Sequence, residues 1–475
     1  MKNQITPKDK DFAEWYQNII DAADLAEHSE VRGAMVIKPY GYALWENIQQ
    51  TLDKKIKKSG AKNVYFPMLI PESYLHKEAE HVEGFSPELA VVTHAGGKKL
   101  EEPYVLRPTS ETIINATFAK WINSYRDLPM MINQWANIVR WELRPRLFLR
   151  TTEFLWQEGH TAHATSEEAE EETQKMLEVY KDFSENYLAI PVEAGIKTEA
   201  EKFAGADHTY TIEGMMQDGK ALQMGTSHHL GQNFAKAFGV KFLDENNKEQ
   251  MPYQTSWGVS TRLIGGLIMA HSDDKGLVLP PQIAPYQVVV LPLWKDDKDK
   301  VEVVKTAKEI SESLKGQGVR VEIDLRDFKS LGEKIYEWEK KGAPIRLEIG
   351  PKEIASKKVS LARRDEDEKS EIAIENIIDI TKVLVEIQKN IFSKAEKRMK
   401  EKSAFTDDYK EFVKKIDKGF FVYAFWCGNE GCETKIKNET KATIRCLPFS
   451  QPQEEGNCIK CGGQAKSRVL FARAY

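Results

Sequence analysis

The chain has 475 residues, of which 41% are hydrophobic and 30% charged, and its formal net charge is −5. That length allows two to four domains, and the composition is typical of a globular protein. No apolar run approaches the ~20 residues that span a bilayer, and residues 1–16 hold no secretory signal, so we expect a cytoplasmic protein without a membrane segment. The acidic balance argues against binding nucleic acid through bulk charge and leaves only local basic patches for such a partner.

Two helices are predicted in the first region, about residues 10–283. In residues 41–60 apolar side chains recur every fourth position, and Gly60 can end the helix. In residues 165–187, Ser166 is the expected N-cap and acidic residues fill the first turn. We expect the two apolar stripes to belong to the core: Leu44, Ile48, Leu52 and Ile56 in the first helix, and Met176, Val179, Tyr180, Phe183 and Tyr187 in the second.

Residues 140–160, RWELRPRLFLRTTEFLWQEGH, are predicted to form a strand, a basic turn and a second strand. Arginine binds phosphate through its planar fork of donors, and an aromatic ring suits the face of a purine. Because alternate residues of a strand share a face, one face of this hairpin would carry Arg140, Glu142, Arg150, Phe154, Trp156 and Glu158. On this stretch alone, a surface hairpin with ordinary ion pairs is an open alternative.

Residues 257–281 place Ser260 and Arg262 directly before an apolar, helix-like run, LIGGLIMA. An arginine at the mouth of such a helix can stack on a base and contact phosphate. Gly265 and Gly266 allow a close approach of the backbone. The alternative is a helix N-terminus with a solvated arginine.

A proline-rich segment at 279–286, LPPQIAPY, marks a boundary. After it, strands predicted at 286–293, 319–326 and 345–350 alternate with helices at 301–318 and 330–342, which favours a small α/β domain with parallel strands. The first of these helices would end near Gly316 and bury Val301, Val304, Ile310 and Leu314. The composition changes again near residue 401, so the expected domains are 1–283, 284–400 and 401–475.

All five cysteines lie between residues 427 and 461. Cys427-x4-Cys432 and Cys458-x2-Cys461, 25 residues apart, place four thiolates in two knuckles suited to tetrahedral zinc. Four protein ligands leave no open position for water, so this zinc ion would be structural. Cys446 is left over and is expected to be a packed thiol. A metal-free module with reduced thiols is the alternative.

Together these segments resemble the motifs of the class II aminoacyl-tRNA synthetases. Residues 138–160 resemble motif 2 and residues 257–281 resemble motif 3. Residues 41–71 resemble motif 1, with Pro67 as the expected strand proline and Pro71 as the alternative. RPTSET (107–112) resembles the Thr-x-Glu loop of class IIa, while EFLWQEGHTAH (153–163) and ALQMGTSHHLGQNF (221–234) are similar to prolyl-tRNA synthetases of the archaeal and eukaryotic type.

The resemblance runs nearly end to end and implies an α/β protein. Its α+β catalytic domain would be built on an antiparallel sheet with flanking helices. An α/β anticodon-binding domain and a small α+β zinc-binding domain would follow. The implied reaction activates L-proline with ATP to prolyl-adenylate and pyrophosphate, then transfers proline to the 3′-terminal adenosine of tRNA(Pro). Such a reaction needs neutralised phosphate oxygens and in-line alignment rather than a covalent nucleophile, and Mg²⁺ would bridge the ATP phosphates.

The resemblance also implies the site residues. The catalytic set is Arg140, Glu142 and Arg262. The proline-binding set, in which Glu111 pairs with the imino charge, is Thr109, Glu111, Arg140, Trp156, Glu158, His160 and His228. The ATP-binding set, in which Phe154 and Arg262 sandwich adenine, is Arg140, Glu142, Arg150, Thr151, Phe154, Gln223, Thr226, Ser260 and Arg262. The anticodon-binding set, whose alternative is a solvated rim, is Glu339, Arg346 and Lys352.

Further expectations follow from the family. The four paired cysteines would hold zinc, the chain would form a homodimer through motif 1, and the C-terminal Tyr475 would fold back towards the catalytic domain. Only about a hundred residues separate Glu158 from Ser260, so we expect no inserted editing domain and no editing in cis. Two other functions stay open: another class IIa specificity, such as threonyl or histidyl, and a tRNA-binding or regulatory paralogue without catalysis.

Overall fold

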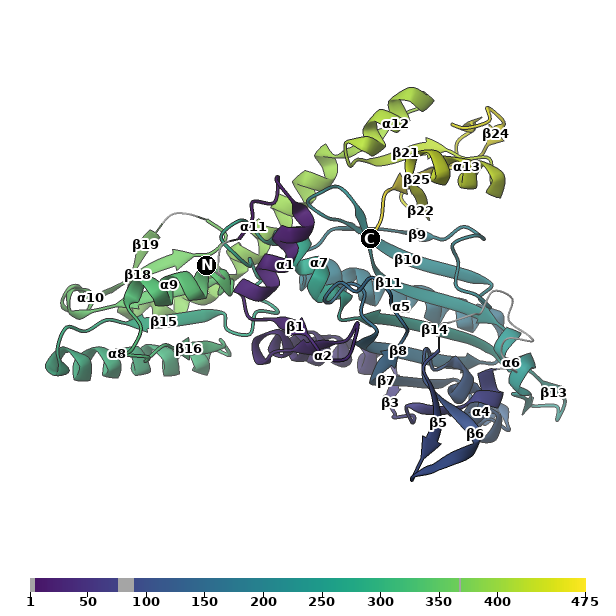
Figure 1. Cartoon of the computed structure of the whole chain (residues 1–475), viewed down its shortest axis with the longest axis horizontal. Coiled ribbons are helices and arrows are strands. Elements are labelled where there is room, and N and C mark those ends of the chain that lie inside the picture. Colours follow the sequence, from purple (N-terminus) through teal and green to yellow (C-terminus); the bar gives the residue numbers. More distant parts are fainter. Residues whose placement is uncertain (1–4, 76–88, 367–368) are drawn as a thin grey trace.

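The computed structural model describes residues 5–75, 89–366 and 369–475 (Figure 1). A large sheet of eleven strands, mostly antiparallel, runs through the molecule in the order β20-β21-β25-β22-β9-β10-β11-β14-β8-β7-β3. In chain order these strands are β3 (Lys62–Asn63), β7 (Met130–Val139), β8 (Glu153–His163), β9 (Val192–Ile196), β10 (His208–Met215), β11 (Ala221–Gly231), β14 (Tyr253–Ser260), β20 (Ser403–Phe405), β21 (Phe421–Phe425), β22 (Thr443–Pro448) and β25 (Arg468–Ala472).

Helices cover one face of this sheet. A single hydrophobic core joins its strands to α1 (Phe12–Ala22), α2 (Pro39–Ser59), α5 (Ser166–Asn186) and α7 (Arg262–His271). Gln157 of β8 faces these helices, because its Oε1 accepts a hydrogen bond of 2.7 Å from the Tyr180 hydroxyl of α5. Since strand residues alternate, Phe154, Trp156 and Glu158 point to the opposite face. That face carries the main cavity.

Shorter elements complete the first part of the chain. Its further helices are α4 (Glu111–Trp121), α6 (Asn233–Phe238) and the 3-10 helix η1 (Tyr125–Asp127). Two small antiparallel pairs are β1 (Ala26–His28) with β2 (Met35–Ile37) and β12 (Phe242–Leu243) with β13 (Glu249–Gln250). A three-stranded sheet holds β4 (Leu69–Pro71), β6 (Lys98–Leu106) and β5 (Val91–Ala95). The expected strand proline Pro67 lies in the irregular segment between β3 and β4, whereas Pro71 ends β4.

The two predicted helices of this part form nearly as expected. The stripe of α2 is buried, and Gly60 ends the helix with φ of 109°, a conformation that favours glycine. The N-cap of α5 was predicted one residue too late. Thr165 has an extended backbone and its hydroxyl accepts from the Glu168 N–H at 3.2 Å, so Ser166 is the first helical residue.

The hairpin predicted at 140–160 was wrong in part. β7 ends at Val139 and β8 begins at Glu153, so Arg140, Glu142 and Arg150 lie in the connection rather than on a strand face. The connection leaves the sheet because it bonds elsewhere: the Thr152 N–H donates to the Gly33 carbonyl, and residues 146–150 close a turn on themselves. The alternation predicted for the second strand is confirmed.

The middle part of the chain is a separate α/β layer, drawn at the left of Figure 1. Its sheet has the order β16-β15-β17-β18-β19, with β15 parallel to β16 and β17, as predicted. The strands are β15 (Val288–Pro292), β16 (Val321–Ile323), β17 (Ile345–Ile349), β18 (Lys358–Arg363) and β19 (Lys369–Ala373). The helices are α8 (Asp297–Gly316), α9 (Leu331–Lys340), α10 (Pro351–Ser356), η2 (Ile374–Asp379) and α11 (Ile380–Glu401).

The buried stripe of α8 differs from the predicted one. Val301 is 72% exposed and Val304 is half-buried. The helix starts four residues earlier than predicted, at Asp297, and the face that meets the sheet passes through Val303, Ala307, Ile310 and Leu314.

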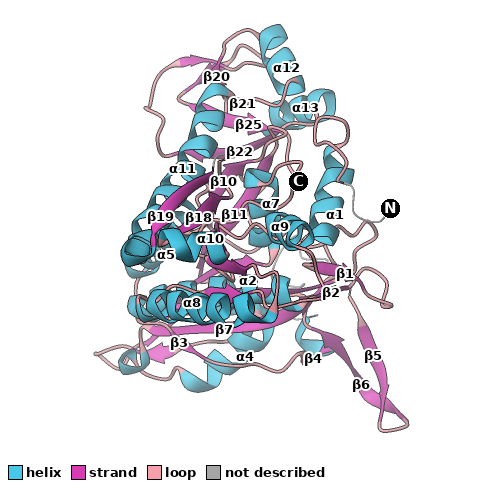
Figure 2. Cartoon of the chain, turned by 90° about the vertical axis from the view of Figure 1, so that its left-hand side faces the viewer, coloured by secondary structure: helices cyan, strands magenta, loops and turns pink. Residues whose placement is uncertain are grey.

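The C-terminal part continues the large sheet instead of standing apart. Its strand β22 pairs with β9, Leu447 opposite Ile196, and Figure 2 shows β20, β21, β25 and β22 stacked above β10 and β11. Its remaining elements are α12 (Tyr409–Asp417), α13 (Glu430–Thr440), β23 (Gly456–Asn457) and β24 (Gln464–Ala465). Tyr475 folds back as expected, because its N–H donates to the Ala221 carbonyl at 3.1 Å. No helix within the described ranges is long and apolar enough to cross a membrane.

Candidate active site and metal centre

A cavity of about 480 Å³ opens on the face of the large sheet that α5 does not cover. It brings together every residue predicted for proline, ATP and catalysis: Thr109, Glu111, Arg140, Glu142, Arg150, Thr151, Phe154, Trp156, Glu158, His160, Gln223, Thr226, His228, Ser260 and Arg262. These residues come from the three strands β8, β11 and β14, from the first residues of α4 and α7, and from two connections. The cavity is therefore assembled by the sheet and not by one local motif.

Strand register decides which side chains enter the cavity. Gln223 and Thr226 of β11 are three residues apart, a spacing that would place them on opposite faces of a regular strand. The pairing with β10 shifts between Ile212 and Glu213, which leaves Met224 as an extra residue in a β-bulge. The bulge turns Gln223 to the same face as Thr226 and His228.

Two carboxylates lie at one end of the cavity. The Thr109 hydroxyl donates to the carboxylate of Glu111, the first residue of α4. Glu158 Oε1 accepts from the Ser110 hydroxyl and from Gln134 Nε2, both at 2.5 Å. Both glutamates are buried, so this end of the cavity can hold a small cationic group in a low-dielectric setting.

Two histidines at this end have opposite protonation tendencies. Burial lowers the pKa of His160, but the hydrogen bond to Glu158, 3.2 Å from Nε2, and the charges of Glu111 and Glu158 outweigh it and raise the pKa above 6.5. Burial and the charge of His160 lower the pKa of His228 to about 3. A neutral His228 holds its Nδ1 3.0 Å from the Thr209 hydroxyl. His160 thus supplies charge, and His228 supplies a neutral hydrogen-bonding ring.

Three arginines converge at the other end. The Arg140 side chain is open to solvent through the cavity. The protein packed around it still removes part of its hydration, and this desolvation lowers its pKa. Its guanidinium lies 5.7 Å from the ring centres of both Phe154 and Trp156. Burial, then the charges of Arg140 and Arg150, lower the pKa of Arg262. Clustered arginines beside aromatic rings form a site for a polyanion with a flat base.

The loop between β7 and β8 holds its arginines in place by local bonds. Arg140 Nε donates to the Pro108 carbonyl at 2.8 Å, which fixes its guanidinium between the acidic and the basic end. Glu142 Oε2 lies 3.4 Å from Arg150 Nε, and Glu142 Oε1 accepts from the Arg144 N–H at 2.8 Å. Thr151 donates to the Glu153 carbonyl at 2.7 Å.

Several cavity residues were missed by the sequence reasoning. Glu201, Lys202 and Phe203, between β9 and β10, line the cavity, as does Thr209 of β10. The Phe203 ring centre lies 4.7 Å from that of His228. No strand or helix periodicity marks this connection, so only the contact in space reveals it.

A second, smaller cavity of about 210 Å³ lies in the middle part of the chain. Glu339 and Arg346 line it, together with the basic residues Arg363, Arg364 and Lys369. The third residue predicted for the anticodon, Lys352, lies outside this cavity, exposed at the start of α10. These basic side chains are ion-paired: Arg346 and Lys369 with Glu348, Arg363 with Asp365, and Arg364 with Asp273.

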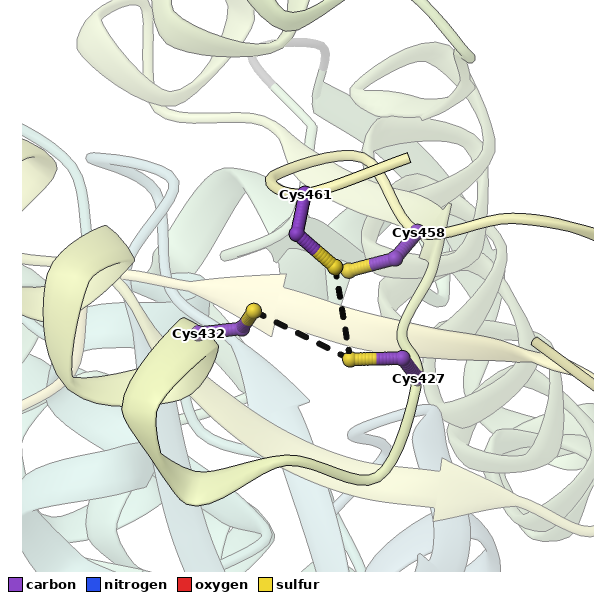
Figure 3. A group of neighbouring side chains, drawn as sticks. All are labelled: Cys427, Cys432, Cys458 and Cys461. Carbon is purple, nitrogen blue, oxygen red and sulfur yellow. Dashed lines mark hydrogen bonds between the residues drawn. The ribbon is translucent and has the colours of Figure 1, made fainter. Parts of the chain in front are cut away.

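The four cysteines of the two predicted knuckles, Cys427, Cys432, Cys458 and Cys461, lie together in the C-terminal part (Figure 3). Their sulfur atoms all lie within 4.8 Å of one another, and Cys427 Sγ is 3.8 Å from that of Cys432 and 3.7 Å from that of Cys461. Tetrahedral zinc with Zn–S bonds of about 2.3 Å sets sulfur atoms about 3.8 Å apart, so the cluster fits this ion. Burial raises the pKa of Cys458, but N–H groups of Cys461 and Lys460 help lower it to about 7, which favours the thiolate. Cys446 lies elsewhere, buried in β22.

Three family models match successive parts of the chain. The tRNA synthetase class II core domain (G, H, P, S and T) matches residues 93–271. The anticodon binding domain matches residues 287–384. The domain described as prolyl-tRNA synthetase, C-terminal, matches residues 409–475.

Full-length relatives give the same result. A proline–tRNA ligase of Porphyromonas gingivalis is 52% identical over 487 aligned residues, 99% of each chain, and proline–tRNA ligase 2 of Clostridioides difficile is 54% identical, covering 99% of this chain and 98% of the relative. The chain belongs to the prolyl-tRNA synthetase family. A prolyl-tRNA synthetase of Cryptosporidium parvum, crystallised with halofuginone and AMPPNP, is 42% identical, covers 100% of both chains and superposes with a TM-score of 0.94.

Family membership makes the chain a proline–tRNA ligase, and its class II core implies the use of ATP with Mg²⁺. The archaeal and eukaryotic subtype stays a prediction. The segment expected to lack an editing insertion, residues 159–259, is described throughout. It forms strands of the large sheet, α5, α6 and the β12–β13 pair, and no separate domain lies within it.

Proposed function

We propose that the cavity of about 480 Å³ activates L-proline with ATP and that the adenylate then passes proline to tRNA(Pro). One observation carries this proposal: a buried carboxylate end and an arginine end meet at Arg140 within a single cavity. A zwitterionic amino acid needs a carboxylate for its cationic nitrogen, and ATP needs cations for its phosphates. Only groups at the junction can serve both substrates at once.

Glu111 and Thr109 receive the imino group of proline, while Arg140 holds its carboxylate. The ring of proline then lies among Trp156, Phe203 and His228, whose surfaces are apolar or neutral. Glu158 and His160 lie at the same end of the cavity, and the hydrogen bond between them balances their buried charges.

ATP lies at the arginine end. Phe154 and Arg262 enclose adenine, and Glu142, Thr151, Gln223, Thr226 and Ser260 offer hydrogen-bonding groups to the adenosine. Arg150 and Arg140 neutralise the phosphates, and Mg²⁺, when bound with ATP, adds charge stabilisation at these oxygens. The proline carboxylate attacks the α-phosphorus in line, and pyrophosphate leaves. No enzyme nucleophile is required, because alignment and charge stabilisation lower the barrier.

The rest of the molecule serves tRNA recognition and stability. Residues 284–400 bind the anticodon, with Glu339, Arg346 and Lys352 as the reading residues. Residues 401–475 bind one structural zinc ion through Cys427, Cys432, Cys458 and Cys461. Residues 1–283 hold the catalytic site and form a homodimer through motif 1, where Tyr65 and Leu69 are exposed large apolar side chains. We place the enzyme in the cytoplasm.

Replacing Arg140 tests the central assignment. Arg140→Ala removes the group shared by both substrates, so proline-dependent ATP–pyrophosphate exchange should fall by at least about a hundredfold. The control is Arg144→Ala, a loop arginine that is exposed and does not line the cavity. Exchange of the Arg140 variant at close to the unmodified rate would refute the assignment.

A further inference from the structure

Helix α13 of the C-terminal, zinc-binding part (residues 401–475) supports a connection of the catalytic part. This connection borders the carboxylate end of the cavity, where we propose that proline binds. This connection, residues 197–207, links β9 to β10, and its members Glu201, Lys202 and Phe203 line the cavity. The Phe203 N–H donates to the Thr209 hydroxyl at 2.9 Å, and the same hydroxyl lies 3.0 Å from His228 Nδ1. The connection thus carries the Phe203 ring and reaches His228 through that ring and through Thr209.

The connection begins at Thr198, which is tied to α13. The Thr198 hydroxyl donates to Glu433 Oε1 at 3.1 Å, and both residues are about 95% buried, with 4% and 5% of their surface exposed. The Thr198 carbonyl accepts the N–H groups of Glu201 and Lys202 at 3.1 and 2.9 Å. The turn that carries the cavity residues is thus built directly on the residue that Glu433 holds.

One turn further along α13, a second residue contacts the same connection. Lys437, four residues after Glu433, places its Nζ 3.3 Å from Glu201 Oε1. The Lys437 side chain is 55% exposed, and an exposed ion pair contributes little because solvent screens it. The buried hydrogen bond to Glu433 is therefore the stronger of the two contacts.

The helix α13 is itself fixed on both sides. Cys432 of the metal cluster stands in its first turn, directly before Glu433. Its neighbour β22 is joined to the catalytic sheet by a buried ion triad, in which Glu213 Oε1 lies 2.8 Å from Lys197 Nζ and Glu213 Oε2 lies 3.0 Å from Arg445 Nη2. Lys197 immediately precedes Thr198. The cysteine cluster and the triad thus hold α13 against the start of the connection.

We infer that Glu433 is a positioning residue for the proline end of the cavity, acting through Thr198 on Phe203 and His228. The inference rests on the proposed proline site. Glu433 itself does not line the cavity, so it touches no substrate. The zinc-binding part thereby contributes to amino acid binding as well as to stability.

The test measures ATP–pyrophosphate exchange and separates the KM for proline from the KM for ATP and from kcat. Glu433→Ala and Thr198→Val each remove the hydrogen bond and should raise the KM for proline about tenfold, with the KM for ATP and kcat changing less than about twofold. Glu433→Gln keeps an acceptor for the Thr198 hydroxyl and should restore the KM for proline. Lys435→Ala, at an exposed position of the same helix, is the matched control and should behave like the unmodified enzyme.

Zinc content and thermal unfolding are measured on each variant. Because Thr198 lies outside the zinc-binding part, Thr198→Val carries the test even where Glu433→Ala loses zinc or fails to fold. An unchanged KM for proline in Thr198→Val would overturn the inference. So would equal changes in all three kinetic constants, with Glu433→Gln no better than Glu433→Ala. If the unmodified enzyme shows no proline-dependent exchange, the proposed function fails first and the inference falls with it.

Discussion

At the scale of single residues, the site depends on charges that are buried together. Glu111, Glu158 and His160 lie within one end of the cavity, where an unpaired charge would be costly. The hydrogen bond between Glu158 and His160 keeps the imidazole protonated beyond its usual range. The remaining negative charge of Glu111 then stays available for the cationic nitrogen of the substrate.

The raised pKa of His160 predicts a pH dependence of stability. Because the pKa in the folded protein is above 6.5, protonated His160 stabilises the fold fully below about pH 6.5, and this stabilisation is lost as the pH rises through the folded pKa. The free energy of unfolding of the unmodified enzyme should exceed that of His160→Gln most at about pH 6 and progressively less towards pH ~9. Urea unfolding followed by tryptophan fluorescence measures the difference.

The control for this trend is His208→Gln, which changes an exposed histidine at the start of β10. It tests whether the trend belongs to His160 or follows the loss of any histidine from this part of the chain. A difference for His160→Gln that grows with rising pH would show that the sign of the argument is wrong.

At the scale of elements, two properties of the large sheet position the site: side chains alternate between the faces of each strand, and neighbouring strands pack closely. β8 sends Phe154, Trp156, Glu158 and His160 into the cavity, while Gly159 between them faces the Trp257 ring. A Cβ added at Gly159 would come within 2.0 Å of that ring, which is only 1% exposed and cannot move aside. The glycine is therefore a steric requirement of the strand that carries the site.

Gly159→Ala should destabilise the protein by about 3 kcal/mol and reduce proline activation, because β8 must shift to relieve the clash. The comparison is Gly316→Ala at the end of α8, where a Cβ meets nothing within 4 Å and where alanine should raise stability by about 0.5 kcal/mol. Thermal unfolding and ATP–pyrophosphate exchange check both variants. Equal stability of the two would contradict the packing argument.

Much of this arrangement was predictable from sequence. The helix α2 with its Gly60 cap, the parallel strands of the middle part and the four-cysteine cluster follow from periodicity and spacing. The bulge that brings Gln223 into the cavity depends on pairing with β10, and Phe203 enters through an irregular connection. Neither has a local signal, because both are decided by contacts with other segments of the chain.

Charged loops were the least predictable elements. A strand through Arg140 and Glu142, a basic turn and a second strand were predicted here, yet backbone groups of residues 140–152 bond to Gly33 and to one another. Here tertiary contacts override the local preference for a strand. The resemblance to motif 2 assigned Arg140, Glu142 and Arg150 to the site, and all three line the cavity, although the backbone expected for them was wrong.

At the scale of the whole molecule, the three parts are joined more tightly than their sequence boundaries indicate. The C-terminal part extends the catalytic sheet through β22 and β9. Arg364 of the middle part binds Asp273, just after α7, with Nη1 2.8 Å from Oδ2 and Nη2 2.6 Å from Oδ1. The smaller cavity, which Arg364 lines, is thus linked directly to the segment that follows α7.

The four-cysteine cluster predicts a fixed zinc content. Protein purified without chelator should contain about one zinc ion per chain, and Cys432→Ser should lose most of it and unfold at a lower temperature. Cys446→Ala changes a cysteine that lies outside the cluster and should keep the full zinc content. Elemental analysis with a thermal scan measures both quantities. Absence of zinc from the unmodified protein would reject the metal site.

The most direct measurement of the central claim is amino-acid-dependent ATP–pyrophosphate exchange by the unmodified enzyme, with proline, threonine, histidine, alanine and cysteine supplied separately. We expect strong exchange with proline and far weaker exchange with threonine and histidine. Exchange with none of the five by folded, zinc-loaded protein would contradict this expectation and would favour a tRNA-binding protein without catalysis.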